Sequence, residues 1–302
     1  MKEKEFISTI KQILGSEYIG DDCAYLKDLG IVITQDSLVE GVHFIKDLIT
    51  PYQLGYKSVM VNISDVSASG AKPAYLTISI SLPSNIETDF IEQFYLGCQK
   101  ACNNDVKIVG GDITSADKIY ISVCAIGTTE NRNISSRKSA KIGQKVIVSG
   151  IHGSSGAGLK LLLSGKKEPE KFIKSHLEPQ AQTEFGKYLG ENVKELYAAM
   201  DTSDGLMDAL STIANESGVL LDIDFEKIPY DKEITQFQNW QDLILFGGED
   251  YQIVATVPQD INIGTTIGEV KQGLGVNLKI NNNYIFYDKQ MVEKSIYNHF
   301  SN

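Results

Sequence analysis

Polar and apolar side chains alternate along residues 74–83, AYLTISISLP, and this pattern restricts the fold more than any other segment of the chain. In a strand, alternate side chains point to opposite faces. The two faces here are formed by Tyr75, Thr77, Ser79 and Ser81 on one side and by Leu76, Ile78, Ile80 and Leu82 on the other. The pattern predicts a half-covered sheet, and such a sheet needs a cover.

Helical and strand patterns alternate around this strand. Thr50 and Pro51 predict the start of a helix that runs toward Gly70, because threonine caps helices and proline is favoured in their first turn. The other expected elements are an amphipathic helix at 1–14, a strand at 31–39, a helix at 88–103, a short buried strand with a glycine turn at 106–112 and a strand at 120–129. Together these elements predict one α+β unit with a mixed sheet.

A polar segment, residues 130–143, separates that unit from a second one. The second unit predicts a mixed α/β domain, with strands at 145–150, 218–224 and 250–257, a helix after the glycine-rich turn HGSSGAGL, and a helix at 203–217. We therefore expect an N-terminal domain at 1–137 and a C-terminal α/β domain at 138–302. The fold class expected is two-domain, α+β followed by α/β.

Charge and composition exclude several classes of function. The 302 residues contain 28 Lys and Arg against 39 Asp and Glu, so the net charge of −11 gives no basic surface for a nucleic acid or an anionic membrane. No apolar run approaches the roughly 20 residues that span a bilayer, and a cytoplasmic protein is expected. The four cysteines include no C-x-x-C pair and indicate buried thiols, not a disulfide framework or a zinc site.

The common nucleotide-binding motifs are missing, and aspartate beside glycine or hydroxyl residues takes their place. There is no G-x-x-x-x-G-K-[ST] loop and no G-x-G-x-x-G after a strand. The recurring segments are GDDCA at 20–24, TQDS at 34–37, NISD at 62–65, GGD at 110–112, DTSDG at 201–205 and GGED at 247–250. Each alone is compatible with ordinary turn and capping chemistry. Their number suggests carboxylates that hold magnesium around phosphate groups.

The glycine-rich turn HGSSGAGL has two interpretations. Small residues before a helix can cradle a phosphate at the helix N-terminus. Close packing of the helix on the second sheet is the favoured interpretation, because Gly156 and Gly158 allow backbones to approach and no cation except His152 accompanies them.

Over nearly its whole length the chain resembles the thiamine-monophosphate kinase family, in the superfamily of aminoimidazole ribonucleotide synthetase and selenophosphate synthetase. The resemblance lies in long, specific segments: IGDDCAYL, TQDSLVEGVHF, GYKSVMVNISDVSASGAKPAYLTISISLP, VGGDIT, DTSDGLMDAL, GGEDYQI and the terminal IYNHF. It implies ATP-dependent phosphorylation of thiamine monophosphate to thiamine diphosphate by direct in-line transfer, with several magnesium ions as cofactors and no general base.

The resemblance also implies roles for individual residues. The magnesium ligands implied are Asp22, Thr34, Gln35, Asp36, Asp65, Asp112, Asp201 and Asp204. Gly111, Asp112, Arg137 and Ser203 are implied to contact ATP, and His43, Glu249 and Tyr297 to contact the thiamine substrate. Gln35 departs from the family pattern, in which threonine is common, although its backbone carbonyl could still serve a metal ion.

In the family fold, the N-terminal sheet pairs with that of a second subunit, so the resemblance implies a homodimer. A sibling enzyme with another acceptor, or a non-catalytic nucleotide or metal-binding protein, remain as alternatives. VEGVHF and IYNHF favour the thiamine substrate over the sibling acceptors. The sequence leaves open the substrate affinities, the number of metal ions, the preference for magnesium over manganese, and whether the enzyme serves biosynthesis or salvage.

Overall fold

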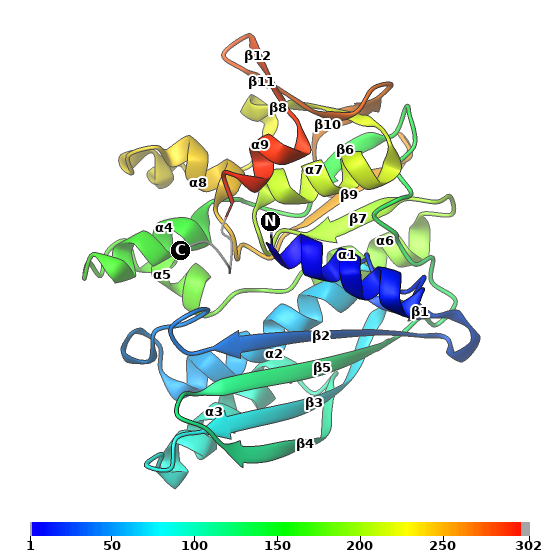
Figure 1. Cartoon of the computed structure of the whole chain (residues 1–302). Helices are drawn as coiled ribbons and strands as arrows, with labels where there is room; N and C mark the ends of the chain where they lie inside the picture. Colours follow the sequence, from blue (N-terminus) through cyan, green and yellow to red (C-terminus); the bar gives the residue numbers. More distant parts are fainter. Residues whose placement is uncertain (1, 297–302) are drawn as a thin grey trace.

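The computed structural model describes residues 2–296, and it contains two mixed β-sheets with helices packed on them (Figure 1). The first sheet has the order β1-β2-β5-β3-β4, with only β3 and β4 parallel. Its strands are β1 (Ala24–Leu26), β2 (Ile31–Val39), β3 (Lys72–Leu82), β4 (Lys107–Ser115) and β5 (Tyr120–Thr128). Two helices, α2 (Pro51–Ala68) and α3 (Thr88–Cys102), cover one face of it.

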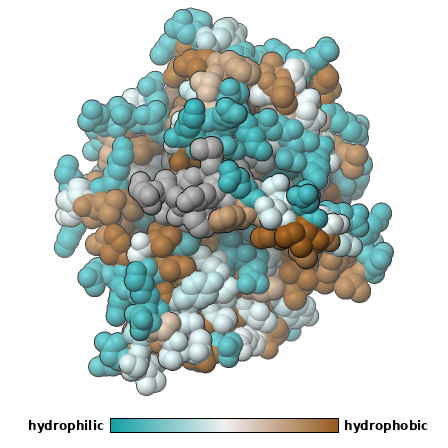
Figure 2. All heavy atoms as spheres, in the orientation of Figure 1, coloured by the Kyte–Doolittle hydropathy of each residue, from teal (hydrophilic) through white to brown (hydrophobic). Residues whose placement is uncertain are grey.

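The alternation in β3 separates the two faces of this sheet as predicted. Leu76, Ile78 and Ile80 are buried and join one apolar core with side chains of α2 and α3. Tyr75 and Thr77 are exposed on the opposite face, over which Figure 2 shows pale side chains of intermediate hydropathy. No helix in the described part of the chain covers this outer face (Figure 1).

Helix α2 begins where the sequence predicts. The Thr50 side chain accepts a hydrogen bond from the Gln53 backbone N–H, and the Gln53 side chain accepts one from the Thr50 backbone, which completes a capping box. Gly55 and Gly97 let α2 and α3 approach closely, since a Cβ on either would lie 1.9 Å from a backbone oxygen of the other helix. This close contact fixes α2, which supplies several site residues, against the sheet.

The second sheet has the order β12-β11-β8-β10-β6-β9-β7. Its strands are β6 (Lys145–Val148), β7 (Ala198–Asp201), β8 (Leu220–Asp224), β9 (Ile253–Val257), β10 (Thr265–Lys271), β11 (Gly275–Ile280) and β12 (Asn283–Tyr287). The remaining helices are α1 (Lys2–Leu14), α4 (Ser154–Leu163), α5 (Glu170–Leu177), α6 (Thr183–Asn192), α7 (Leu206–Ser217), α8 (Trp240–Phe246) and α9 (Lys289–Glu293). Side chains of α7 pack on one face of this sheet, and side chains of α6 with Ala68 of α2 pack on the other.

Two sequence predictions about individual elements are wrong. The strand expected to be short and buried, with a glycine turn at its end, is instead an exposed edge strand. Among the described strands β4 pairs only with β3, and it continues through Gly110 and Gly111 to Ser115. The helix expected from Ser203 begins at Leu206, because Gly205 has a φ of 105° that interrupts helical geometry.

The segment between β5 and β6 contains no helix or strand in the described chain, in keeping with its polar sequence. The domain boundary placed at residues 137 and 138 stays a prediction. Within residues 2–296, no helix is both long enough and apolar enough to cross a membrane.

Candidate active site

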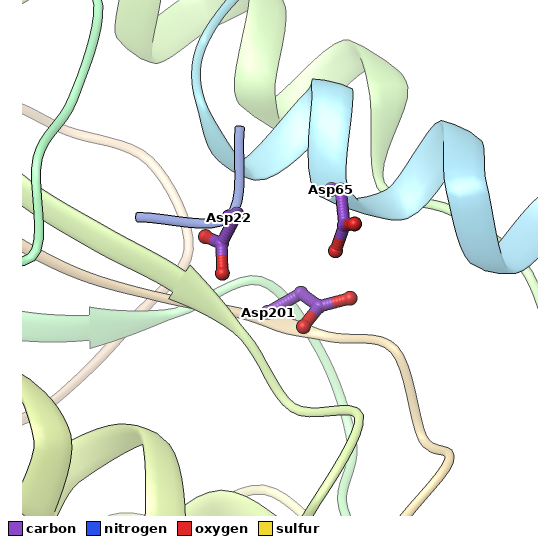
Figure 3. A group of neighbouring side chains, drawn as sticks. All are labelled: Asp22, Asp65 and Asp201. Carbon is purple, nitrogen blue, oxygen red and sulfur yellow. The ribbon is translucent and has the colours of Figure 1, made fainter. Parts of the chain in front are cut away.

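Three carboxylates from distant segments meet between the two sheets. Asp22 precedes β1, Asp65 lies in the last turn of α2, and Asp201 is the last residue of β7. Each offers an oxygen, and these oxygens all lie within 4.8 Å of one another (Figure 3). We call these three residues the carboxylate cluster.

Burial makes the carboxylate cluster electrostatically unfavourable on its own. Burial raises the pKa of Asp22 to about 7 although Arg137 opposes the shift, and Asp201 adds to it. Burial and the neighbouring carboxylates also raise the pKa of Asp65, and burial raises that of Asp201. Because like charges in a low-dielectric site disfavour ionisation, the cluster needs either protons or cations.

Arg137 is the fixed cation that contacts the cluster. Its Nη2 forms an ion pair with Asp22, its backbone N–H donates to Asp21 at 2.7 Å, and its buried Nε has no hydrogen-bond partner among the described residues. A single guanidinium does not balance three carboxylates. Hard, clustered oxygen donors of this kind fit magnesium, so the residues present match the metal that the sequence implies.

Strand β2 adds two of the predicted ligands on the side that faces α2. The Thr34 hydroxyl donates to Asp65 at 2.6 Å, and the backbone N–H of Asp36 donates to the Asn62 side chain at 3.0 Å. Burial, followed by the charge of Asp22, raises the pKa of Asp36. The structure therefore brings Thr34 and Asp36 beside the carboxylate cluster.

The DTSDG turn approaches the same place from the second sheet. The Ser203 hydroxyl donates to Asp201 at 3.0 Å, and the Ser64 hydroxyl of α2 donates to its other oxygen at 2.6 Å. Asp204 acts electrostatically on Tyr251, together with Asp36 and Asp201. Neither Asp201 nor Ser203 caps α7, because Gly205 is its N-cap residue and has no side chain.

Gln35 points away from the cluster. Its side-chain Nε2 donates to Ser122 of β5 at 3.0 Å, on the outer face of the first sheet. Neighbouring residues of a strand face opposite sides, which separates Gln35 from Thr34 and Asp36. Its backbone carbonyl is thus the group left for the predicted metal contact.

Gly111 and Asp112 lie on the far edge of the same sheet. Asp112 pairs with Ser79, Ser79 with Ser122, and Ser122 with Ser37, so Asp112 is three strands from β2. At about 4.8 Å per strand, the separation is about 14 Å. Paired residues share a face, which puts the Asp112 side chain on the outer side. Within one chain, Asp112 is not brought to the carboxylate cluster.

A groove that the sequence did not reveal runs beside β4. It has a volume of about 750 Å³ and lies between the end of α3 and the start of β4. Its lining is formed by Glu92, Tyr95, Leu96, Gln99, Cys102, Asn104, Val106, Lys107, Ile108 and Val109. The groove arises only when α3 and β4 pack, so no single segment signals it.

Two of the three predicted substrate residues lie near each other. His43 follows β2, where its Nδ1 accepts a hydrogen bond from the Val39 backbone N–H at 3.0 Å, and its charge acts on Glu249. Glu249 forms an ion pair with Lys57 and lies 3.2 Å from the His176 Nδ1, two residues that sequence reasoning missed. Tyr297, the third predicted residue, lies outside the described residues.

The GGED segment adopts unusual backbone geometry. Glu249 and Tyr251 have φ values of 64° and 49°, a region that residues other than glycine rarely adopt. The Glu249 backbone N–H donates to the Ser203 carbonyl at 2.7 Å. This hydrogen bond holds Glu249 against the turn that carries Asp204. Strained backbone of this kind concentrates at functional sites.

The glycines of the HGSSGAGL turn serve packing, but their close contacts are with other helices and not with the second sheet as predicted. The Asp250 carboxylate accepts hydrogen bonds from the backbone N–H groups of Gly153 and Ser155, so it occupies the N-terminus of α4. A Cβ on Gly158 would lie 2.0 Å from the Phe172 carbonyl oxygen of α5. The glycine therefore serves the contact between α4 and α5.

Comparisons with known proteins agree with this geometry. Residues 20–129 match the family of AIR synthase related proteins, N-terminal domain. The thiamine-monophosphate kinase of Aquifex aeolicus is 38% identical over 97% of this chain and 96% of its own length. That of Bacillus subtilis is 34% identical over 80% of this chain and 78% of its own.

A solved structure is also closely similar. AaThiL complexed with AMPPCP and TMP superposes with a TM-score of 0.86 at 37% identity, covering 95% of this chain and 98% of that one. The structural superposition and the sequence alignment both extend over nearly the whole chain and point to the same family. The chain belongs to the thiamine-monophosphate kinase family.

Proposed function

We propose that this protein transfers the γ-phosphoryl group of ATP to thiamine monophosphate and releases ADP and thiamine diphosphate. The observation that carries the proposal is the near full-length similarity to thiamine-monophosphate kinases, including a relative complexed with an ATP analogue and TMP. The carboxylate cluster supports it, because phosphoryl transfer between two anions requires many oxygen ligands for cations.

The reaction needs no general base from the protein. A phosphate monoester has a second pKa of about 6, so the terminal oxygen of the acceptor is already mostly ionised at neutral pH. That oxygen forms the new bond to the γ-phosphorus as the bond to the β,γ-bridging oxygen breaks, and ADP leaves with the electron pair. We infer direct in-line transfer without a phosphoenzyme, since the aspartates are committed to metal ions.

Asp22, Asp65 and Asp201 would hold magnesium, together with Thr34 and Asp36 on the neighbouring strand. Asp204 and the backbone of Gln35 are proposed as further ligands. Magnesium supplies the positive charge that balances the phosphates and stabilises the transferred group. The protein's own part is to orient both phosphates and to provide Arg137 beside Asp22.

We infer that ATP binds with its base in the groove between α3 and β4. The groove has a mixed apolar and polar lining, contains Tyr95 and lies next to the start of the strand that carries Gly111 and Asp112. A Cβ on Gly111 would lie 1.8 Å from the Ile78 carbonyl oxygen, so only glycine fits this backbone.

We further infer that the active site is completed by a second copy of the chain. Asp112 lies about 14 Å from β2 and on the outer face of its sheet, whereas the carboxylate cluster lies on the inner side. A homodimer that covers the outer face can bring the Asp112 of one copy toward the cluster of the other. This arrangement also supplies the cover that the half-polar sheet lacks in the described chain.

Product analysis tests the reaction. Purified protein is mixed with ATP, magnesium and thiamine monophosphate, with free thiamine and aminoimidazole-pathway substrates in parallel. Formation of ADP and thiamine diphosphate only with thiamine monophosphate is the expected result. Consumption of another acceptor instead would leave the carboxylate cluster in its role but refute the acceptor. Localisation in the cytoplasm stays a prediction.

Subunit complementation tests the shared site. Asp112→Asn and Asp65→Asn are each expected to be inactive. After the two variants are unfolded and refolded together, about a quarter of the parent activity should return, because half of the dimers are mixed and each has one intact site. No recovery in mixed dimers, verified by differential tags, would mean that one chain supplies both residues.

A further inference from the structure

Glu249 is held at both carboxylate oxygens by residues from different helices. Its Oε1 lies 3.0 Å from the Lys57 Nζ of α2, and its Oε2 lies 3.2 Å from the His176 Nδ1 of α5. The Lys57 and His176 side chains are 1% and 8% exposed, whereas that of Glu249 is 27% exposed. The supporting residues are therefore inaccessible, and Glu249 alone reaches solvent.

The ionisation of this group is set by its neighbours. Burial acts to raise the pKa of Glu249, but Lys57, His176 and His43 outweigh it and leave the pKa lowered. Burial and then Lys57 lower the pKa of His176 to about 4, so its ring is neutral at neutral pH. Lys57 and Glu249 thus balance each other's charge, and the neutral His176 ring lies 3.2 Å from the second carboxylate oxygen.

The tautomer of His176 follows from its two contacts. The Nδ1 atom lies 3.0 Å from the Ser155 hydroxyl as well as 3.2 Å from Glu249. A carboxylate only accepts, so a neutral ring that approaches it with Nδ1 must carry its proton there. The Ser155 hydroxyl at the start of α4 can then accept from the same N–H and keep the ring in place.

Stability alone is a weak reason for such an arrangement. Replacing a buried ion pair with apolar residues of similar volume is often neutral or stabilising, because desolvation opposes the attraction. The contacts with Lys57 and His176 instead fix the direction of the Glu249 carboxylate, which would otherwise rotate. The fixed Glu249 is also tied by its backbone to Ser203, beside the proposed metal ligands.

We propose that Lys57 and His176 are positioning residues that hold Glu249 ready for the heteroaromatic part of the acceptor. This inference rests on the proposed function. Thiamine monophosphate carries a cationic thiazolium ring and an amino group on its pyrimidine ring. An ionised carboxylate with one open side can attract the thiazolium cation or accept a hydrogen bond from the amino group. It does not attract the acceptor's phosphate, which is also an anion.

Steady-state kinetics test the proposal. Lys57→Met and His176→Leu are expected to raise the KM for thiamine monophosphate about tenfold, as loss of one charge-assisted contact predicts. The KM for ATP and the kcat at saturating acceptor should change less than about twofold, because the lost interaction is uniform binding of one substrate. Equal increases in both KM values, or a loss confined to kcat, would refute the positioning role.

Conservative variants provide the matched controls. His176→Asn keeps an N–H donor near the position of Nδ1 and should recover most of the acceptor affinity that His176→Leu loses. Lys57→Arg keeps the charge and should be intermediate. If His176→Asn and His176→Leu are equally impaired while both are folded by circular dichroism, the hydrogen bond to Glu249 has no part in acceptor recognition.

Direct binding separates this inference from the proposed reaction. Calorimetric titration with thiamine monophosphate should give the same order of affinities, with the parent and His176→Asn above His176→Leu. Binding that follows this order in a protein without turnover would support the positioning role and refute the kinase activity. A parent that does not bind thiamine monophosphate would refute both.

Discussion

His152 allows a stability prediction whose size follows from its surroundings. The side chain is fully buried in the loop before α4, and neither ring nitrogen has a hydrogen-bond partner within residues 2–296. Burial lowers its pKa from 6.5 to about 3. The folded protein therefore keeps the ring neutral at pH values where the unfolded chain takes up a proton.

The sign follows from this difference in proton binding. Between pH 6.5 and about 3 the unfolded state binds more protons, so the free energy of unfolding falls as the pH falls. At pH 5 the solution is 1.5 units below the pKa of the ring in the unfolded chain. Proton uptake by the unfolded state therefore lowers the free energy of unfolding by about 2 kcal/mol relative to pH 7.5. His152→Leu should remove this loss.

Urea unfolding of the parent and His152→Leu at pH 7.5 and 5.0 measures the effect. The variant should be at least as stable as the parent at pH 7.5, because it removes two unpaired buried nitrogens. At pH 5.0 its advantage should grow by about 2 kcal/mol. Met207→Leu, a change at another buried position, is the control and should keep the parent's pH dependence. Identical pH dependence for His152→Leu and the parent would refute the reasoning.

Three further predictions concern the site. Asp65→Asn should abolish turnover and remove the stabilisation that magnesium gives the parent. That stabilisation is about 2.7 kcal/mol at a magnesium concentration of one hundred times the Kd, and it is measured by unfolding with and without the metal. An active variant with unchanged magnesium dependence would contradict the metal assignment. Gly111→Ala should lower activity strongly because its Cβ meets the Ile78 carbonyl oxygen at 1.8 Å, whereas Gly110→Ala, with nothing within 4 Å, should stay close to the parent; equal activities of the two variants would show that the close approach is unimportant. Gln35→Thr should keep kcat within about threefold, since its side chain points to the outer face; a much larger loss would mean that the side chain itself contributes to the site.

Local patterns in the sequence predicted much of the first sheet. The alternation along β3 and the capping residues Thr50 and Pro51 act over a few neighbours, so the strand faces and the helix start could be predicted correctly. The exposure of β4 could not, because VKIVGGD is apolar enough for a buried strand and only the strand order places it at an edge.

The candidate site likewise contains residues that the local sequence predicts and residues that it does not. The carboxylate segments were recognisable because aspartate recurs beside glycine or hydroxyl residues in each. Lys57 and His176 gave no such signal, since a lysine in α2 and a histidine in α5 gain meaning only when both reach Glu249. The outward direction of Gln35 and the distance of Asp112 from β2 likewise depend on register and strand order.

The origin of the carboxylate cluster has a consequence for the assembly of the molecule. Asp22 and Asp65 belong to the segments that build the first sheet and its helix, and Asp201 belongs to the second sheet. Their mutual repulsion opposes the final approach of the two halves, and a divalent cation reverses that repulsion. The proposed metal ion would therefore hold the two halves together at this point, and its removal would weaken their contact first at the carboxylate cluster.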